Sequence, residues 1–278
     1  MHADCPRLAA ILSAIPLFGA SVAAQPSDEE YADLVNPSVI AELNGIAPGG
    51  TVWVGIHFEI KDGWHTYWPG QNDTGFGTQI ETAAPAELVV GDTYWPAPHR
   101  YTAPGGILDH VHEHAVTALL PITAPQSAAL GSDITVSFDL SWLVCDDVCI
   151  PGWKTITLTL PVIKSPVAKH GVTVQRFEKA RERIPNTDMN KARVTVDWSG
   201  QIATVRAIDA NKLAFYPDEG GSKVLDLINA GSASSDVLRL SFDSQDPVLS
   251  GVLEIHRSGD SVTFLSLRAS PKGSPLEP

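Results

Sequence analysis

The amino-acid sequence predicts an all-β protein, built from two β-sandwich domains joined by a short, partly helical connector. Three observations support this fold class. The chain has 278 residues, which suits two domains of ordinary size. Its 22 glycines and 21 prolines favour many turns and short strands over long helices. Several segments alternate between apolar and polar residues, as half-buried strands do.

The first domain is predicted to span residues 25–165, and it begins with a loose, polar lead-in at residues 25–50. Its clearest strand is residues 51–60, where apolar side chains occupy every second position. The other expected strands are residues 116–122, 134–144 and 154–160, of which the last two are natural partners. The expected loops are residues 70–77, rich in glycine, and residues 94–110. A loop as long as the second one is usually functional or mobile.

The second half of the chain is predicted to hold a connector and a smaller β domain. Residues 166–191 form the expected connector, with one helix near Val172 to Ile184. Residues 192–270 form the expected second β-sandwich, and residues 271–278 a tail. The strands expected in this domain are residues 192–198, 202–208, 237–242, 252–255 and 262–267.

Residues 1–24 are typical of a signal peptide, which indicates export to the periplasm. Arg7 precedes an apolar run from Leu8 to Ala20, and small residues end at Ala24 before Gln25. The alternative is a frayed N-terminal helix. No later apolar run reaches the roughly 18 residues of a membrane span, so none is expected. A net charge of −13 without a Lys/Arg cluster argues against nucleic acid and anionic membranes as partners.

The mature chain would keep two cysteines, Cys145 and Cys149, because cleavage removes Cys5. An even cysteine count in an exported protein points to a disulfide. In a straight strand, positions four apart lie about 13 Å from each other, whereas a disulfide needs Cα atoms closer than about 7 Å. We therefore expect the chain to turn between the two cysteines, at the tip between strands 134–144 and 154–160.

The short ring that this disulfide would close favours a functional role over a structural one. Loop entropy gives a ring of this size roughly 2 kcal/mol of stabilisation, less than a bridge between distant strands would give. Asp146 and Asp147 inside the ring disfavour a thiolate nearby, so the pair is not expected to be strongly activated by itself. Trp142 and Trp153 flank the ring and either pack in the hairpin or form a docking surface for a partner protein.

Several segments carry a resemblance to the N-terminal periplasmic domain of the DsbD family of thiol:disulfide interchange proteins, and more closely to its ScsB-like variant. These segments are Ile60-Lys61-Asp62-Gly63-Trp64-His65-Thr66-Tyr67-Trp68, Tyr94-Trp95-Pro96-Ala97-Pro98, Leu120-Pro121 and Cys145-Asp146-Asp147-Val148-Cys149-Ile150-Pro151. They follow the family order over about residues 35–165. The second β domain, with Phe215-Tyr216-Pro217, resembles the second domain of ScsB-type proteins.

The resemblance implies immunoglobulin-like sandwiches and a cysteine pair that exchanges electrons with thioredoxin-fold proteins of the periplasm. It also implies a membrane-embedded electron donor, here expected on a separate polypeptide, and it gives Cys149 the role of forming the mixed disulfide. A cap loop would shield the pair, at about Pro96 to Asp109, with Tyr101 or Ile107 as the lid. The cysteine spacing differs from the longer one in DsbD itself, which puts the role of Cys149 in doubt.

A histidine cluster is the other candidate site. On a strand, His110, His112 and His114 would share one face at successive distances of about 6–7 Å. Three imidazoles are suited to Zn²⁺ or Cu²⁺, and the alternative is a solvated polar face. His57 and His65 are interpreted as ordinary strand residues.

The sequence therefore predicts a periplasmic disulfide-exchange protein that acts through Cys145 and Cys149 and requires no cofactor. Two other hypotheses stay open: a copper- or zinc-binding module that uses the histidines and is linked to metal tolerance, and a pair of β domains with an inert bridge.

Overall fold

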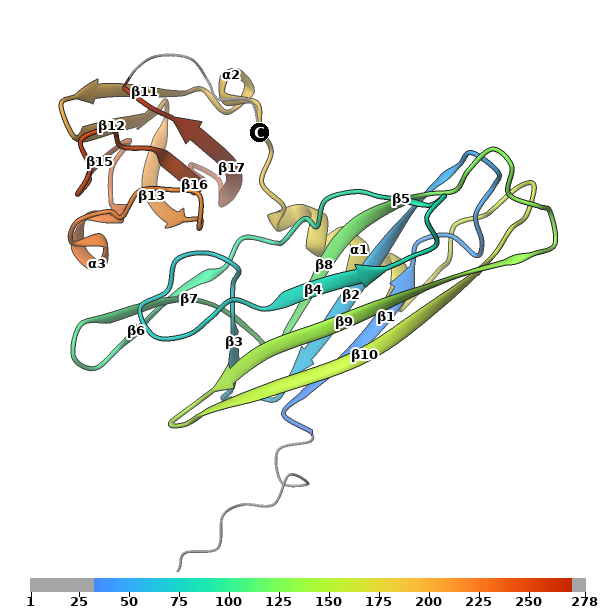
Figure 1. Ribbon diagram of the computed structural model, residues 1–278. Coiled ribbons are helices and arrows are strands. Elements are labelled where there is room, and N and C mark those ends of the chain that lie inside the picture. The colour runs from blue at the N-terminus through green and yellow to red at the C-terminus, as the bar shows by residue number, and fades with distance from the viewer. Residues whose placement is uncertain (1–32, 272–278) are drawn as a thin grey trace, which may run out of the picture.

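The computed structural model describes residues 33–271, which form two β domains with a helix between them (Figure 1). The predicted signal peptide and residues 272–278 of the predicted tail lie outside the described residues. The prediction of an all-β, immunoglobulin-like fold class is confirmed. No helix within residues 33–271 is long and apolar enough to cross a membrane.

The first domain is a sandwich of two antiparallel sheets. One sheet has the order β1-β2-β8-β5, and the other has the order β10-β9-β3-β7-β6, with β4 paired to β9. The strands of the first sheet are β1 (Val35–Ala41), β2 (Thr51–Ile60), β5 (Val89–Val90) and β8 (Ala115–Thr123). Those of the second are β3 (His65–Tyr67), β4 (Gln79–Ala83), β6 (His99–Ala103), β7 (Ile107–Glu113), β9 (Asp133–Cys145) and β10 (Cys149–Pro161).

The core of this domain lies between the two sheets, and the alternating strands supply it. Buried side chains from β2, including Val54, Ile56 and Phe58, belong to one cluster with Phe138 and Trp142 of β9. The predicted pairing of strands 134–144 and 154–160 is confirmed. They belong to β9 and β10, which pair continuously from Asp133 to Cys145 of β9. This long hairpin carries the cysteines at its tip.

Two expectations about loops were wrong. The lead-in at residues 25–50 contains the edge strand β1, which its polar residues and Pro37 concealed; an edge strand tolerates proline because one side of it needs no ladder partner. The loop expected at residues 94–110 is largely the β6–β7 hairpin. Its strands bury polar side chains such as Asp109 and His110, so no apolar alternation marks them.

The connector helix, α1 (Val172–Arg183), packs against the first domain. Phe177 and Ala180 of α1 are buried with Leu119 of β8. The second domain then has two sheets with the orders β11-β12-β15 and β14-β13-β16-β17. Its elements are α2 (Met189–Ala192), β11 (Val194–Ser199), β12 (Ile202–Ala207), β13 (Ala210–Pro217), α3 (Leu227–Ala230), β14 (Ser232–Ala233), β15 (Val237–Ser241), β16 (Leu249–Arg257) and β17 (Ser261–Ala269). Strands β13 and β14 were not predicted.

The two domains pack directly on each other beside the β6–β7 hairpin (Figure 1). Trp68 and Ala97 of the first domain form a buried cluster with Tyr216 and Phe264 of the second. Arg100 of β6 also donates hydrogen bonds to two backbone carbonyls of α3. The interface is therefore partly apolar and partly hydrogen-bonded.

Buried histidines predict that the protein loses stability in mild acid. Burial lowers the pKa of His57 and of His110 to about 4, and that of His112 to about 3. The unfolded chain therefore takes up protons first as the pH falls below about 6.5, and each imidazole then costs about 1.4 kcal/mol per pH unit. The stability that these neutral imidazoles contribute is complete above pH 6.5. It is lost as the pH falls from 6.5 to the pKa values of the histidines in the folded protein.

Urea unfolding between pH 7.5 and 4.5 measures this slope. We expect a smaller slope for His112→Asn than for the wild-type protein, because this variant removes a buried imidazole. Equal slopes for wild type and His112→Asn would contradict the prediction.

Candidate redox site

The β9–β10 hairpin brings the two cysteines together as the sequence predicts. Cys145 ends β9 and Cys149 begins β10, and the two residues are direct partners across the hairpin. Their Cα atoms lie 4.3 Å apart and their sulfurs form a disulfide. Only residues 146–148 separate the strands. The pair therefore sits at the very tip of a long two-stranded arm.

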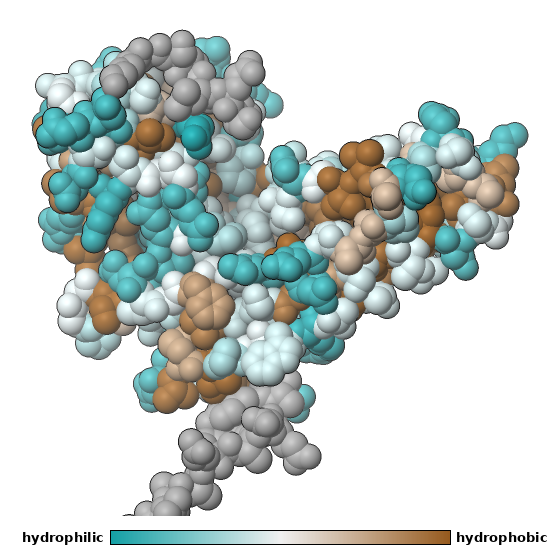
Figure 2. Space-filling view, viewed as in Figure 1, coloured by the Kyte–Doolittle hydropathy of each residue, from teal (hydrophilic) through white to brown (hydrophobic). Residues whose placement is uncertain are grey.

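The two cysteines differ sharply in exposure. Cys145 is 1% exposed, whereas Cys149 is exposed, as are Asp146, Asp147 and Val148 of the turn. Figure 2 shows apolar side chains at the lower end of the molecule, where the hairpin turns, and Val148 is 54% exposed there. Of the two cysteines, Cys149 is therefore the residue that lies open to solvent.

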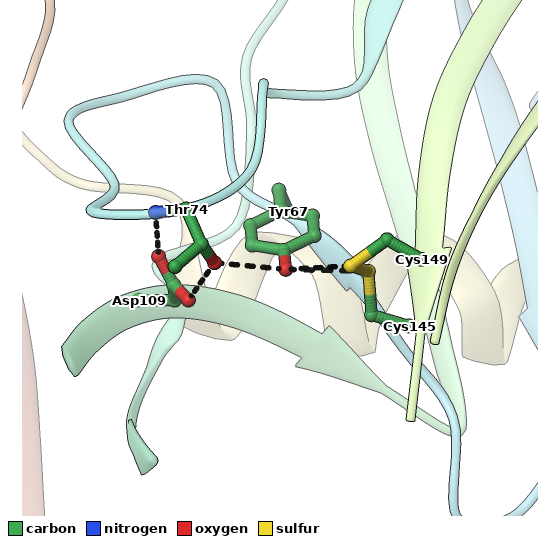
Figure 3. Close-up of a disulfide and its surroundings, with 5 residues drawn as sticks. All are labelled: Tyr67, Thr74, Asp109, Cys145 and Cys149. Carbon is green, nitrogen blue, oxygen red and sulfur yellow. Dashed lines mark hydrogen bonds between the residues drawn. A yellow bond between two sulfur atoms is a disulfide. The ribbon is translucent and has the colours of Figure 1, made fainter. Parts of the chain in front are cut away.

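The short strand β3 lies directly beside the cysteines, because it pairs with β9 on one side and with β7 on the other. His65 is the direct partner of Cys145 in this pairing. Tyr67, two residues on, packs in a small buried cluster with Cys145 and Val111. Its hydroxyl donates a hydrogen bond to Cys145 Sγ at 3.3 Å and lies 3.6 Å from Cys149 Sγ (Figure 3).

A chain of hydrogen bonds continues from Tyr67 away from the sulfurs. The Tyr67 hydroxyl lies 3.3 Å from Thr74 Oγ1, which donates to the carboxylate of Asp109 at 2.6 Å (Figure 3). Asp109 is 2% exposed and also accepts hydrogen bonds from the backbone N–H groups of Asp73 and Thr74. The loop that holds Thr74 is thus fixed on the buried carboxylate of β7.

The number of protons limits what Tyr67 can do in this chain. Thr74 has one hydroxyl proton and gives it to Asp109, so towards Tyr67 its oxygen can only accept. Tyr67 also has one proton, and it can give that proton either to Thr74 or to a sulfur. Burial raises the pKa of Tyr67, so its hydroxyl stays protonated at neutral pH. The site thus keeps one neutral donor within reach of both sulfurs.

His65 adds a second polar group beside the disulfide. Its ring lies 5.5 Å from that of Tyr67 and 4.6 Å from that of Tyr101. Burial lowers the pKa of His65, so the imidazole is neutral at pH 7. Sequence reasoning gave no role to His65, Tyr67 or Thr74. The aromatic residues of segment 64–68 are visible in the sequence, but the pairing of this segment with β9 is not.

The expected lid residues have different positions. Tyr101 of β6 packs against the cluster of Cys145, Tyr67 and Val111, where a shielding residue is expected. Ile107 lies at the turn end of the β6–β7 hairpin, paired with Ala103.

The two tryptophans beside the cysteines also differ. Trp142 is buried in the core, where its ring meets that of Phe58 at 6.1 Å, so the expectation that it docks a partner was wrong. Its position in β9 points it between the sheets. Trp153 is 77% exposed on β10. It lines a groove of about 960 Å³ beside the hairpin, together with Ile150 and Pro151.

The three histidines of the predicted metal site are not brought together. His112 is buried with its ring stacked on Trp95, and Nδ1–H of the buried His110 donates to the carbonyl oxygen of Gln71 at 2.7 Å. His114 follows the end of β7 with a φ of 59°, and its imidazole contacts Asp62 at 3.0 Å. Within residues 33–271 no group of three or more His, Cys, Asp or Glu side chains could hold a metal ion.

Comparisons with known proteins identify a family for the first domain and a fold for most of the chain. Residues 32–161 match the model of the family described as thiol:disulfide interchange protein DsbD, N-terminal. No curated protein matches the sequence. The N-terminal periplasmic domain of ScsB from Proteus mirabilis has the same fold, with a TM-score of 0.57 at 14% identity over 88% of this chain and 96% of that chain.

A second solved structure is similar over a shorter stretch. It is the reduced N-terminal domain of DsbD from Neisseria meningitidis, with a TM-score of 0.32 at 15% identity, over 50% of this chain and 94% of that chain. The family match and the ScsB fold confirm the resemblance that the sequence motifs indicated. Residues 32–161 of this chain therefore match the DsbD N-terminal domain family, and the chain shares its fold with the N-terminal periplasmic domain of ScsB.

Proposed function

We propose that this protein is a periplasmic thiol–disulfide exchange protein, which passes electrons through Cys145 and Cys149 to or from thioredoxin-fold partners. The observation that carries the proposal is the unequal exposure of the two cysteines above the hydroxyl of Tyr67. One sulfur is open to attack, and the other is buried beside a hydrogen-bond donor. The periplasmic location and a membrane-embedded electron donor, expected from the sequence, are parts of the same proposal.

The exchange begins at the exposed cysteine. A partner thiolate attacks Cys149 Sγ, forms a mixed disulfide with it and displaces Cys145 as a thiolate. A second thiolate of the partner then attacks the partner's own sulfur and releases Cys149 as a thiolate. Two electrons have moved from the partner to the pair, and two protons complete the thiols. The reverse sequence carries the electrons onward.

Tyr67 stabilises the sulfur that is displaced first. A thiolate at Cys145 is surrounded by protein, where an unpaired charge is costly. A thiolate is a much better acceptor than the oxygen of Thr74, so the single proton of Tyr67 turns towards it. This donor is in place before the reaction, so the protein needs no rearrangement at the moment of exchange.

The inert-bridge hypothesis fits this geometry less well. Strands β9 and β10 already pair along their whole length, and a bridge at their tip closes only a small ring. A structural bridge gains nothing from an exposed sulfur. The metal-binding hypothesis has no observation within the described residues that favours it.

The reduction potential of the pair tests the proposed function. We expect a value between about −270 and −120 mV, the range of thioredoxin-fold exchange proteins, and reduction by thioredoxin within minutes. The mature protein is equilibrated in glutathione or dithiothreitol buffers, and free thiols are counted. A potential below about −300 mV together with resistance to thioredoxin would identify a structural bridge and reject the proposal.

Single cysteine variants should react unequally. With Cys145→Ala, the exposed Cys149 should form a stable mixed disulfide with a thioredoxin that carries an activated disulfide. With Cys149→Ala, the buried Cys145 should react at least roughly tenfold more slowly, because its thiol lies inside the protein and reaches the activated disulfide of thioredoxin less easily. Mass spectrometry against time measures both rates. Equal rates for Cys145→Ala and Cys149→Ala would refute the proposal that exposure makes Cys149 the reactive cysteine.

Replacement of Tyr67 by phenylalanine should slow exchange. The variant Tyr67→Phe removes the donor and leaves the ring, so reduction of the disulfide should slow by about tenfold or more, the usual effect of losing a hydrogen bond to a charged group. Stopped-flow reduction by dithiothreitol measures the rate constant. Tyr101→Phe is the matched control, because it removes a hydroxyl from the same cluster. The role of Tyr67 would be refuted by equal rate constants for the two variants.

A further inference from the structure

The second β domain makes specific contacts with a loop that supports the redox site. We call residues 68–78, between β3 and β4, the support loop. Its residue Gln71 reaches into the second domain, where its backbone N–H donates to the carbonyl of Pro217 at 2.9 Å. The side-chain Nε2 of Gln71 donates to the carbonyls of Asp218 at 2.8 Å and Gly221 at 3.0 Å.

These acceptors belong to a fixed part of the second domain. Pro217 is the last residue of β13, Asp218 and Gly221 follow it, and Asp218 N–H donates to the carbonyl of Ser250 in β16. The hydroxyl of Ser250 donates to the carboxylate of Asp218 at 2.7 Å. Gln71 is thus held by three carbonyls from a segment that is hydrogen-bonded to strand β16 of that domain.

Three residues after Gln71, the support loop reaches the redox site. Thr74 lies beside the Tyr67 hydroxyl, and the backbone of Gly75 lies against the Tyr67 ring, since a Cβ at Gly75 would fall 2.3 Å from ring atoms. Further along, the N–H and hydroxyl of Thr78 both donate to the carbonyl of Tyr67 at 3.0 Å. The loop therefore fixes the ring and the hydroxyl of Tyr67 from several sides.

The same loop is also held on the first domain. Asn72 accepts from His110 N–H, and Asp73 accepts from Leu108 N–H, each at 2.7 Å. Asp109 holds Thr74 as described above. The loop is therefore suspended between β7 and the second domain, and Gln71 is its main polar contact with the second domain among the described residues.

We infer that the second β domain positions Tyr67 at the sulfurs, with Gln71 as the positioning residue. This inference rests on the proposed exchange at Cys145 and Cys149, and it gives the second domain a part in that reaction. The carbonyls of Pro217, Asp218 and Gly221 hold Gln71, which keeps the loop from Gln71 to Gly75 in place. Thr74 and Gly75 then hold the side chain of Tyr67, so that its hydroxyl stays within reach of the sulfurs. A domain that has no cysteine thus affects the rate of thiol exchange.

The test is a double-mutant cycle between Gln71 and Tyr67, with dithiothreitol as the reductant. Gln71→Ala should slow reduction of the disulfide by roughly fivefold, the effect of an average hydrogen bond lost from the support. In the Tyr67→Phe background the same substitution should have no further effect, because the positioned hydroxyl is already gone.

Controls separate positioning from a general loss of structure. Gln79→Ala, on the exposed surface of β4, is the matched glutamine variant and should keep the wild-type rate. Thermal unfolding of each variant shows whether it is folded at the temperature of the assay. Equal rates for wild type and Gln71→Ala, or the same slowing in the Tyr67→Phe background, would overturn the inference.

Dithiothreitol also keeps this inference distinct from the proposed function. If thioredoxin fails to reduce the wild-type protein, the exchange function is rejected. The effect of Gln71 on attack by a small thiol is measured independently of that result. If thioredoxin reduces the protein and Gln71→Ala changes nothing, the exchange function stands and the role of the second domain is refuted.

Discussion

The pairing of the three-residue strand β3 with both β9 and β7 is the constraint on which the redox site depends. This pairing sets His65 opposite Cys145 and brings Tyr67 beneath the disulfide. Without it, the tip of the β9–β10 hairpin would be an exposed arm with two cysteines and no neighbour that could influence their chemistry. A strand this short has little stability of its own, so its place depends on the longer strands on either side and on the support loop that follows it.

The hairpin also explains why two cysteines four positions apart differ in exposure. As direct partners in an antiparallel pair, Cys145 and Cys149 lie on the same face of the hairpin, and both sulfurs lie near the Tyr67 hydroxyl. Cys145 lies inside, because β3 covers its side of the hairpin, whereas Cys149 lies on the outer strand β10. Position in the sheet therefore accounts for the unequal exposure on which the proposed roles of the two sulfurs rest.

Local patterns predicted the parts of the structure that depend on neighbouring residues. Strand β2, the β9–β10 hairpin, helix α1 and the turn between the cysteines follow from alternation, charge and the geometry of a disulfide. The β6–β7 hairpin was missed because its buried residues are polar and are satisfied by contacts with distant segments. Asp109 shows the reason: its partners are Asp73 and Thr74, about 35 positions away. The role of Tyr67 was missed for the same reason, since only tertiary pairing brings it to the sulfurs.

The groups around the sulfurs are polar but neutral, and this feature sets the character of the site. Burial lowers the pKa of His65 and raises that of Tyr67, so at neutral pH neither residue carries a charge. The exposed Asp146 and Asp147 of the turn oppose a thiolate, and the buried carboxylate of Asp109 lies behind Thr74. In the proposed exchange, the group that stabilises a negative sulfur is therefore the neutral hydroxyl of Tyr67, which already donates to Cys145 Sγ in the disulfide. The proposed site thus relies on a hydrogen bond to stabilise the thiolate.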